Sequence, residues 1–359
     1  PPAGTFGSNA RGDRQDFAGR LASVAEYRIA ATAVNTLFSG FSKGVNTVTE
    51  VQNEMQQMNK VLNTSQKNLN NLKSAAVSTA QEFGKSTTGV LKGFKVFAQQ
   101  GLPTNEVIKY GKAVALASNV SSFGTEGLSE LITAGIKTFG KAEVGADGLK
   151  LVDKFLAVEG ARAVSEGDLA DVFKRVGPQA QSAGIGVDEL NALTTIIKER
   201  TRSESGEIGT ALRFVIKNLQ SSTTQKSLKE ILPDLKFTDE TGDLRDPYSV
   251  LRDISKSFPS LSRRKQAKIS GEIGDTRFSS RTTALLTGLS QGEGEQIINI
   301  GKGAGGESFK RNQIVMQSLQ KQFEKTGAAF EGFALSLSLI HISEPTRLRR
   351  ISYAVFCLK

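Results

Sequence analysis

A seven-residue repeat of apolar side chains between residues 27 and 97 places the strongest constraint on the fold of this chain. A sustained heptad repeat keeps one face of a helix turned toward a partner helix and favours a left-handed supercoil. We therefore expect residues 27–100 to form a long helical coiled-coil segment that associates with itself, a trimer being one of the oligomers this allows. The unbroken register of the repeat, the predicted seam, holds Tyr27, Val34, Phe41, Val48, Met55, Leu62, Leu69, Ala76, Phe83, Val90 and Phe97.

Glycines within this repeat limit how far one helix can run. A glycine inside a helix costs up to about 1 kcal/mol relative to alanine. We expect breaks near Gly40–Gly44 and Gly84–Gly93, with a continuous helix between them. The repeat does not say whether the partner helix is intramolecular, so a second arrangement stays open. In that arrangement, helices fold back on each other or on the rest of the chain.

Residues 184–219 predict a helical hairpin that forms part of the core. Asp188 is placed to cap the first helix, and Gly206 opens the second. Lys198, Glu199 and Arg202 are expected on the solvent side, where substitutions have little effect. Apolar residues recur at helical spacing on one face of each helix. These core-hairpin residues are Leu190, Leu193, Ile196, Ile197, Ile208, Leu212, Val215, Ile216 and Leu219.

Helix stop and start signals divide the remaining chain into short helices. They are Gly101 with Pro103, a cap at Thr125, a Ser165–Asp168 capping box, a boundary at Gly177–Pro178, and Asp246 before Pro247. Thr241–Gly242 is expected in the turn of one small β-hairpin. The fold class is therefore all-α: the coiled-coil segment is followed by a compact bundle of helical hairpins over residues 101–300. Residues 1–26 are expected to form a flexible leader, and residues 301–336 a glycine-rich joint with a further helix.

The last residues do not resemble the rest of the chain. The segment LSLIHISEPTRLRRISYAVFCL resembles a translated sequencing-library adapter, which makes residues 337–359 a non-native addition. The one histidine and the one cysteine of the chain, His341 and Cys357, both lie in it. Without them, the chain has no Cys/His zinc site, no disulfide and no histidine for acid–base chemistry. We expect no catalytic, metal-binding or cofactor-binding residues, and the start at Pro1 indicates a fragment.

A net charge of +10 favours partners with acidic surfaces, including nucleic acid. The basic run Ser262–Lys268 lacks the interleaved aromatic residues that stack on bases, so a solvated helix face is the simpler interpretation. No signal peptide and no membrane-spanning apolar run is present in the sequence. Gly301, Gly303 and Gly306 spell a G-x-G-x-x-G pattern, but the alternating β-α units that a dinucleotide site requires are missing around it.

The amino-acid sequences of four segments resemble those of phage tail tape measure proteins. The segment GIGVDELNALTTIIKERTRSESGEIGTALRFVIKNL (Gly184–Leu219) is similar to the core module of that family. Gly93–Gly140, Asp239–Phe258 and Gly271–Leu289 resemble the flanking parts of the same core. Together they cover roughly half of the chain, which makes the match more specific than a single short motif.

The resemblance implies a structural protein that templates tail-tube polymerisation, sets tail length and takes part in genome ejection. It implies location in the virion, in the lumen of the phage tail, and in the cytoplasm of the bacterial host during assembly. Its implied partners are the tail tube protein, tail assembly chaperones and tail tip or baseplate proteins, with DNA contact during ejection. The alternative is a flagellin-like or other secreted helical filament protein. A dinucleotide-binding enzyme is a more remote alternative, which a strand at Ile297–Ile300 would favour.

Overall fold

The computed structural model describes residues 47–343. The chain divides into two units, one formed by residues 54–329 and the other by residues 1–53 and 330–359. In the second unit, residues 47–53 and 330–343 are helical. The predicted leader, the seam residues Tyr27, Val34 and Phe41, and residues 344–359 of the adapter-like segment lie outside the described residues.

The described residues fold as helices joined by short turns, which confirms the all-α fold class. A helix over residues 47–62 comes first. It is followed by α2 (Gln66–Phe83), α3 (Thr87–Gln99), α4 (Thr104–Ala117), α5 (Thr125–Val144), α6 (Leu149–Ala161), α7 (Glu166–Ser182), α8 (Val187–Thr201), α9 (Ser205–Leu219), α10 (Ser222–Ile231), α11 (Pro247–Ser257), the 3₁₀ turn η1 (Phe258–Ser260), α12 (Arg263–Ser290), α13 (Glu293–Lys302), α14 (Glu307–Met316) and α15 (Leu319–Ser343).

One short antiparallel pairing interrupts the helices, at the predicted β-hairpin. Thr238 and Leu244 form an isolated bridge, and the Arg245 N–H donates to the Phe237 carbonyl at 2.9 Å. Gly242 turns the chain between them with φ +91°, a conformation that favours glycine. Within residues 47–343 this is the one β-bridge, as the sequence predicted.

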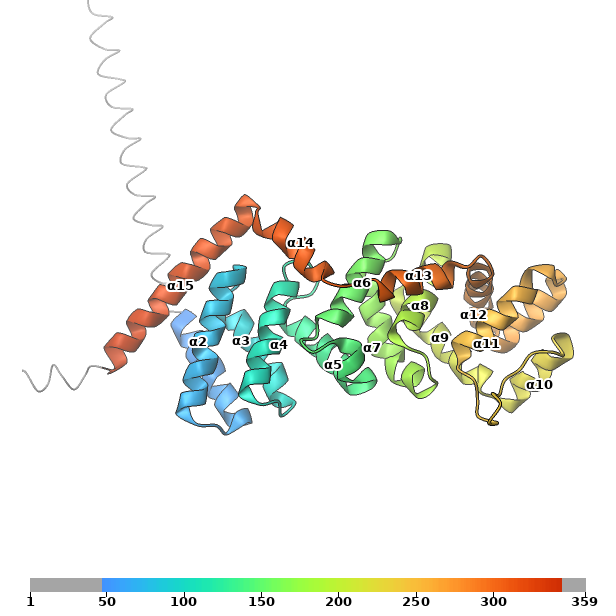
Figure 1. Ribbon diagram of the computed structural model, residues 1–359, viewed down its shortest axis with the longest axis horizontal. Coiled ribbons are helices and arrows are strands. Elements are labelled where there is room, and N and C mark those ends of the chain that lie inside the picture. Colours follow the sequence, from blue (N-terminus) through green and yellow to red (C-terminus); the bar gives the residue numbers. More distant parts are fainter. Residues whose placement is uncertain (1–46, 344–359) are drawn as a thin grey trace, which may run out of the picture. The chain divides into compact units, whose positions relative to one another are not determined.

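Within the unit 54–329, α2 to α9 follow one another along a row (Figure 1). Neighbouring helices of the row pack on each other: α3 packs on α4 and α5, and α7 packs on α8 and α9. Helix α9 also packs on α12. Aromatic residues fill the interior of the row. Phe97 stacks on Tyr110 with ring centroids 5.3 Å apart, and Phe173 contacts both Phe139 and Phe155.

The prediction of a continuous helix between Gly44 and Gly84 is wrong, because the chain turns at residues 63–65. Asn63 has φ +43°, a left-handed conformation that asparagine tolerates better than most residues, and Ser65 caps α2. The expected break at Gly84 is confirmed, and Gly84 ends α2 with φ +61°. Gly89 and Gly93, in contrast, lie inside α3, where Gly93 leaves room for Ser129 of α5.

Much of the predicted seam is used inside the unit 54–329. Leu69, Ala76, Phe83, Val90 and Phe97 are buried in α2 and α3, which pack on each other and on α4. Met55 and Leu62 are half-buried, as is Val48 in the other unit. From Leu69 to Phe97, the repeat therefore packs on neighbouring helices of the same chain, which is the second arrangement that the sequence left open.

Several helix boundaries follow the predicted signals and three do not. Thr125 is not a cap: it is the first residue of α5, and Gly124 holds the N-cap position. The Ser165–Asp168 capping box and the Asp246 cap before Pro247 are present. Asp188 is not an N-cap: Gly186 holds that position and its N–H donates to the Glu189 carboxylate at 2.8 Å. Gly177–Pro178 is not a boundary either, since α7 continues through it. Val176 and Ala180 are buried on either side, and their burial outweighs the missing proline N–H.

Candidate functional site

The feature that most distinguishes this fold is a return segment, defined here as residues 293–329. After α12, the chain turns back along the row that it has built (Figure 1). Helix α13 packs on α8 and α6, and α14 packs on α6 and α4. The return segment therefore contacts helices that are distant in sequence, and polar contacts hold it in place along most of its length.

Asp153 of α6 holds the joint between α13 and α14. Its side chain is buried, with 5% of the residue exposed. One carboxylate oxygen accepts the Gly306 N–H at 2.8 Å, and the other accepts the Ser308 N–H at 2.7 Å and the Ser308 hydroxyl. These N–H groups belong to the first turn of α14, where a carboxylate is stabilised by free donors and by the helix dipole.

Lys154, the next residue of α6, is held by two carboxylates. Its ammonium lies 2.8 Å from the Asp188 carboxylate and 3.0 Å from that of Glu143, and the side chain is 3% exposed. Asp188 in turn lies against α13 at Gly301, where an added Cβ would overlap its carboxylate. The buried pair Asp153 and Lys154 thus links α6 to α5, to α8 and to the start of α14.

Further along the return segment, similar contacts recur. The Arg311 guanidinium donates to the Leu156 carbonyl and lies 3.3 Å from the Glu159 carboxylate. The Asn119 amide donates to the Asn312 side chain at 2.8 Å. The Lys321 ammonium donates to the Gly84 carbonyl at 3.1 Å, at the end of α2.

The start of the return segment carries an ion-pair network. The Glu293 carboxylate lies 2.8 Å from the Arg200 guanidinium and 3.8 Å from that of Arg162, and Arg162 also binds Glu199 at 2.6 Å. Glu199 additionally accepts the Ala163 N–H at 2.8 Å. Lys198 pairs with Asp168 at 2.9 Å. Lys198 and Glu199 are therefore half-buried partners, and the expectation that they are freely solvated is wrong for both.

The predicted core-hairpin residues are all buried in α8 and α9, from Leu190 to Leu219. They do not mainly face one another. Helix α8 packs chiefly on α13 and α12, whereas α9 packs chiefly on α7 and α12. The two helices are thus consecutive members of the row, and α12 packs on both of them.

The G-x-G-x-x-G pattern has a structural explanation in this joint. Ile297–Ile300 lies in α13 and not in a strand, which contradicts the dinucleotide-binding alternative. Gly301 makes room for Asp188, Gly303 ends α13, and Gly306 precedes α14 with φ +72°. Sequence reasoning missed the partners of these glycines. The available signal was the adjacent charged pair Asp153–Lys154 within the otherwise apolar run LKLVDKFLAV.

Burial shifts the pKa values of two groups near these contacts. Glu166 accepts hydrogen bonds from the Ser121 hydroxyl and the Ser122 N–H, and burial raises the pKa of its carboxyl above the ordinary value. Burial, together with the neighbouring Lys321 ammonium, lowers the pKa of Lys85 to about 8. Lys85 donates to the Ser118 carbonyl at 3.0 Å, so both groups belong to contacts between helices.

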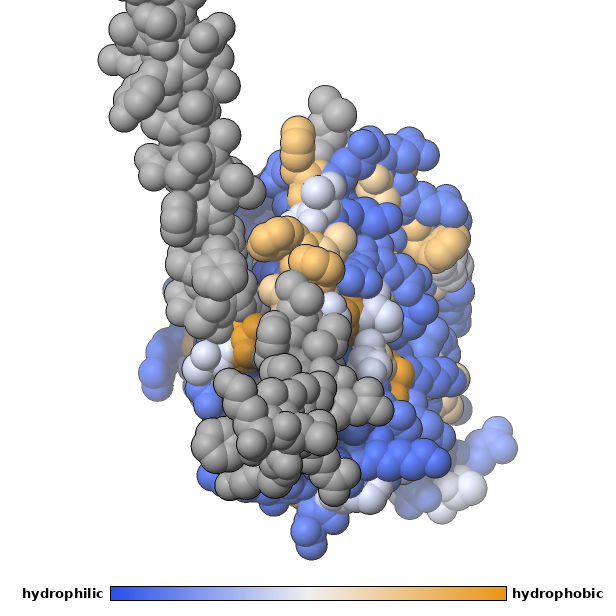
Figure 2. All heavy atoms as spheres, turned by 90° about the vertical axis from the view of Figure 1, so that its left-hand side faces the viewer, coloured by the Kyte–Doolittle hydropathy of each residue, from blue (hydrophilic) through white to orange (hydrophobic). Residues whose placement is uncertain are grey.

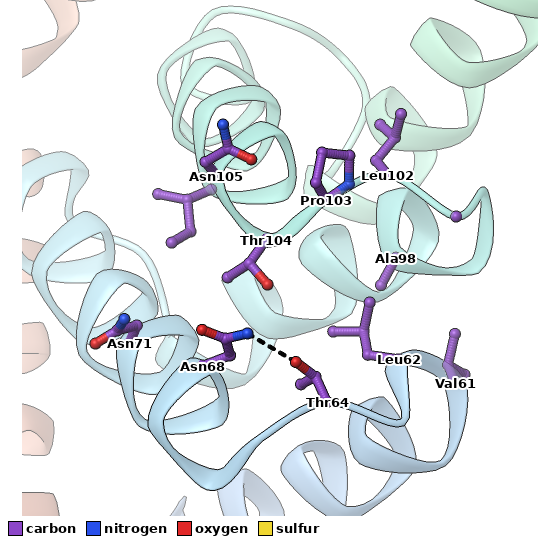
Figure 3. A pocket seen from close by; sticks show the side chains of 12 residues that line it. Val61, Leu62, Thr64, Asn68, Asn71, Ala98, Leu102, Pro103, Thr104 and Asn105 are labelled. Atoms are coloured by element: carbon purple, nitrogen blue, oxygen red, sulfur yellow. Dashed lines mark hydrogen bonds between the residues drawn. The ribbon is translucent and has the colours of Figure 1, made fainter.

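A pocket of about 650 Å³ lies beside α2 and the turn between α3 and α4 (Figure 3). The 12 residues that line it carry no ionisable side chain. Asn68 donates to the Thr64 hydroxyl at 2.8 Å, and apolar residues such as Leu62, Leu102 and Pro103 form other parts of the wall. This lining can contact a neutral group, and its polar groups are amides and hydroxyls.

Residues 47–343 show no metal-binding arrangement of three or more His, Cys, Asp or Glu side chains. No helix in this part of the chain is long and apolar enough to cross a membrane. Most side chains on the face shown in Figure 2 are hydrophilic, with apolar ones gathered near its middle. On the return segment, Phe309, Ile314 and Phe323 are 53%, 72% and 75% exposed.

Comparisons with known proteins find relatives of this chain among phage tail proteins. The sequence model of the family described as phage-related minor tail protein matches residues 77–274. The tape measure protein of Pneumococcus phage Dp-1 is 21% identical over 327 residues, which cover 86% of this chain and 27% of that protein. The probable tape measure protein of Escherichia phage P2 is 24% identical over 173 residues, covering 47% of this chain and 21% of that protein. No solved structure matches significantly.

Proposed function

This chain belongs to the family of phage-related minor tail proteins, and we propose that it is part of a tape measure protein that templates the tail tube and sets tail length. The observation that carries the proposal is the family match over residues 77–274, which contains most of the helical row. The chain spans 27% and 21% of the two tape measure relatives, so the length-setting activity of a whole protein is part of the proposal.

The described structure supports a mechanical role over a catalytic one. Its buried charged groups, such as Asp153 and Lys154, are used for contacts between helices. We propose that the row is a folded, cooperative element of the tape measure, and that extended helices elsewhere provide length. An extended helix rises about 1.5 Å per residue and so converts chain length into distance, whereas helices packed in a row do not.

The proposed partners are those of a tail protein under assembly: the tail tube protein, tail assembly chaperones, tip or baseplate proteins, and further copies of the same chain. The proposed location is the tail lumen of the virion, reached from the host cytoplasm, with DNA contact during ejection. Phe309, Ile314 and Phe323 provide exposed apolar contact points for such partners. The family match favours this proposal over a secreted filament protein.

A nonsense codon at Lys92 in the phage or prophage that encodes the chain tests the proposal. We expect lysates with heads but without tails of normal length, because the template is lost, and a suppressor strain should restore them. A synonymous change at the same codon is the control. Electron microscopy of the particles is the measurement, and mass spectrometry of purified tails should detect peptides from residues 54–329. Normal tails in the nonsense mutant would refute the proposal.

A further inference from the structure

A pocket of about 320 Å³ lies between α7 and α9, within the unit 54–329. Its wall is formed by Gln179 of α7 and by Thr210, Arg213, Phe214 and Lys217 of α9. The Gln179 amide donates to the Arg213 carbonyl at 3.1 Å, which joins the two helices at this point. The wall therefore holds two cationic side chains and no acidic one.

The two cations of the wall have no anionic partner within residues 47–343. Arg213 and Lys217 are exposed, lie one helical turn apart, and form no ion pair in this part of the chain. Helix α9 contains one acidic residue, Glu207, and that residue pairs with Arg281 of α12. Like charges one turn apart repel each other, so an anion that contacts both cations is attracted to this position.

A third cation extends this charge along α9. The Arg175 side chain of α7 lies over two small residues of α9, and its Cδ would be 3.3 Å from a Cβ added to Gly209. Its guanidinium lies beside Gly206. Arg175 is exposed and likewise has no ion pair among the described residues, since Asp171, one turn earlier, binds a hydroxyl at the start of α9 instead. The cations thus follow α9 from Gly206 to Lys217, over about 16 Å at about 1.5 Å per residue.

An aromatic ring lies among these cations. Phe214 lines the pocket and is half-buried, and its ring centroid lies 5.4 Å from that of Phe278 of α12. Helix α12 therefore supports the ring on one side, while the pocket leaves part of it accessible. Unpaired cations beside a fixed aromatic ring are typical of surfaces that bind single-stranded nucleic acid, because phosphates pair with the cations and bases stack on the ring. The basic run Ser262–Lys268 lacks such a ring.

These features distinguish between classes of anionic partner. A single phosphate would occupy the pocket alone and leave the rest of the line of cations unused. An acidic protein segment brings carboxylates but no flat base for the aromatic ring. A nucleic-acid duplex presents phosphates, but its bases are stacked within it. A single strand offers both a row of phosphates and accessible bases.

We propose that a basic face, defined as Arg175, Arg213, Phe214 and Lys217, binds single-stranded nucleic acid. The phosphates contact the three cations, and a base stacks on Phe214. This gives the DNA contact of the proposed function a location on the chain, and it rests on the proposed function only for its role in the phage. Binding in solution is measured without tails, so its failure is distinct from a failure of the tail-length role, which particle morphology tests.

Fluorescence anisotropy of a labelled oligothymidylate, titrated with the whole chain, tests the proposal. We expect saturable binding whose logarithmic affinity falls linearly with the logarithm of the salt concentration. A duplex of the same length and poly-glutamate of matched charge are the competitors, and both should displace the labelled strand less well than unlabelled oligothymidylate. Equal displacement by either competitor would overturn the proposal, because the surface would then not distinguish a single strand from another polyanion.

A pair of charge variants connects binding to this face. The double variant Arg213→Gln, Lys217→Gln should weaken binding about tenfold or more and make the salt slope shallower by about 0.7 per cation removed. The double variant Arg263→Gln, Lys265→Gln is the matched control, because it removes the same charge from exposed positions at the start of α12. The control should bind as the parent does, and equal weakening in both would overturn the proposal.

Phe214→Leu measures the contact with a base separately from the charges. Leucine keeps an apolar side chain against Phe278 but offers no ring, so binding should weaken about tenfold while the salt slope stays that of the parent. Circular dichroism should show an intact fold. Absence of saturable binding by the parent chain, or a Phe214→Leu variant that binds as tightly as the parent, would overturn the proposal.

Discussion

Asp153 shows at the scale of one residue how the return segment is held. Its buried carboxylate accepts both N–H groups and the hydroxyl that the Gly306–Ser308 turn presents. Asp153→Ala leaves those buried donors unsatisfied, so we expect a loss of about 1–3 kcal/mol in the free energy of unfolding. Urea denaturation measures the change. Asp234→Ala, at an exposed aspartate, is the control and should be nearly neutral; equal losses in both variants would contradict the assigned role.

Arg202 occupies a backbone conformation that suits glycine better. It ends α8 with φ +53° and ψ +22°, and its side chain is exposed. We expect Arg202→Gly to stabilise the chain by about 0.5–1 kcal/mol, because glycine has no Cβ to strain this left-handed position. Arg202→Val should destabilise it for the opposite reason. Thermal denaturation of both variants checks the prediction, and a less stable glycine variant would argue against it.

The lowered pKa of Lys85 predicts that the folded chain becomes more stable at alkaline pH. Its pKa is lowered to about 8 in the folded chain from 10.5, by burial first and then by Lys321. Between these two pH values the unfolded chain binds the proton that the folded chain has released, so stability rises with pH. The contribution is lost again as pH falls through about 8. The free energy of unfolding of the parent minus that of Lys85→Met should rise with pH over this window. A difference that does not change with pH would contradict the prediction.

At the scale of elements, the sequence predicted the helices better than their partners. Local signals such as Ser165–Asp168 and Asp246–Pro247 were sufficient, because capping depends on residues within one turn. The turn at Asn63 was missed because asparagine is a weak signal for a left-handed residue. The hairpin α8–α9 was found from its apolar faces, but periodicity contains no information about which helix covers each face.

The burial of side chains in α8 and α9 predicts which substitutions destabilise the chain. Leu193 of α8 and Leu212 of α9 are fully buried, and their replacement by alanine should cost about 2–5 kcal/mol each. Glu199→Ala is also expected to destabilise, by about 1–3 kcal/mol, because it removes the nearest acceptor of Arg162 and the acceptor of the Ala163 N–H. Phe323→Gln, at an exposed position of α15, should stay within about 0.5 kcal/mol of the parent. Denaturant titration distinguishes the buried, ion-paired and exposed positions. A Glu199→Ala variant as stable as the parent would show that the contacts of Glu199 do not stabilise the fold.

At the scale of the whole molecule, the all-α class and the family resemblance were accessible from the sequence, whereas the return path was not. The contacts between Asp153 and Ser308, or between Gly84 and Lys321, join residues far apart in the chain. Nothing local marks such pairs, and the glycines of the joint suggested a different motif. The candidate site was therefore visible only as unexplained charged residues in an apolar helix.

The folded state of residues 54–99 changes what a deletion should do to a tail. If the heptad repeat were one extended helix, removing the two heptads Gln52–Ser65 would shorten the tail by about 20 Å, at about 1.5 Å per residue. In the structure, this deletion removes the fully buried Met58 and the partner Glu54 of Lys95, together with the turn into α2. We therefore expect a lower melting temperature of the chain and a loss of assembled tails in the complete phage.

The point variant Met58→Ala serves as the matched control, because it weakens the same packing without changing length. Under the folded arrangement, the deletion and the point variant should both lower the number of tails, and the tails that do form should keep the parental length. Electron micrographs measure both quantities. Viable particles with tails uniformly shortened by about 20 Å would mean that residues 52–65 are extended in the assembled tail, since only an extended helix converts that deletion into that distance.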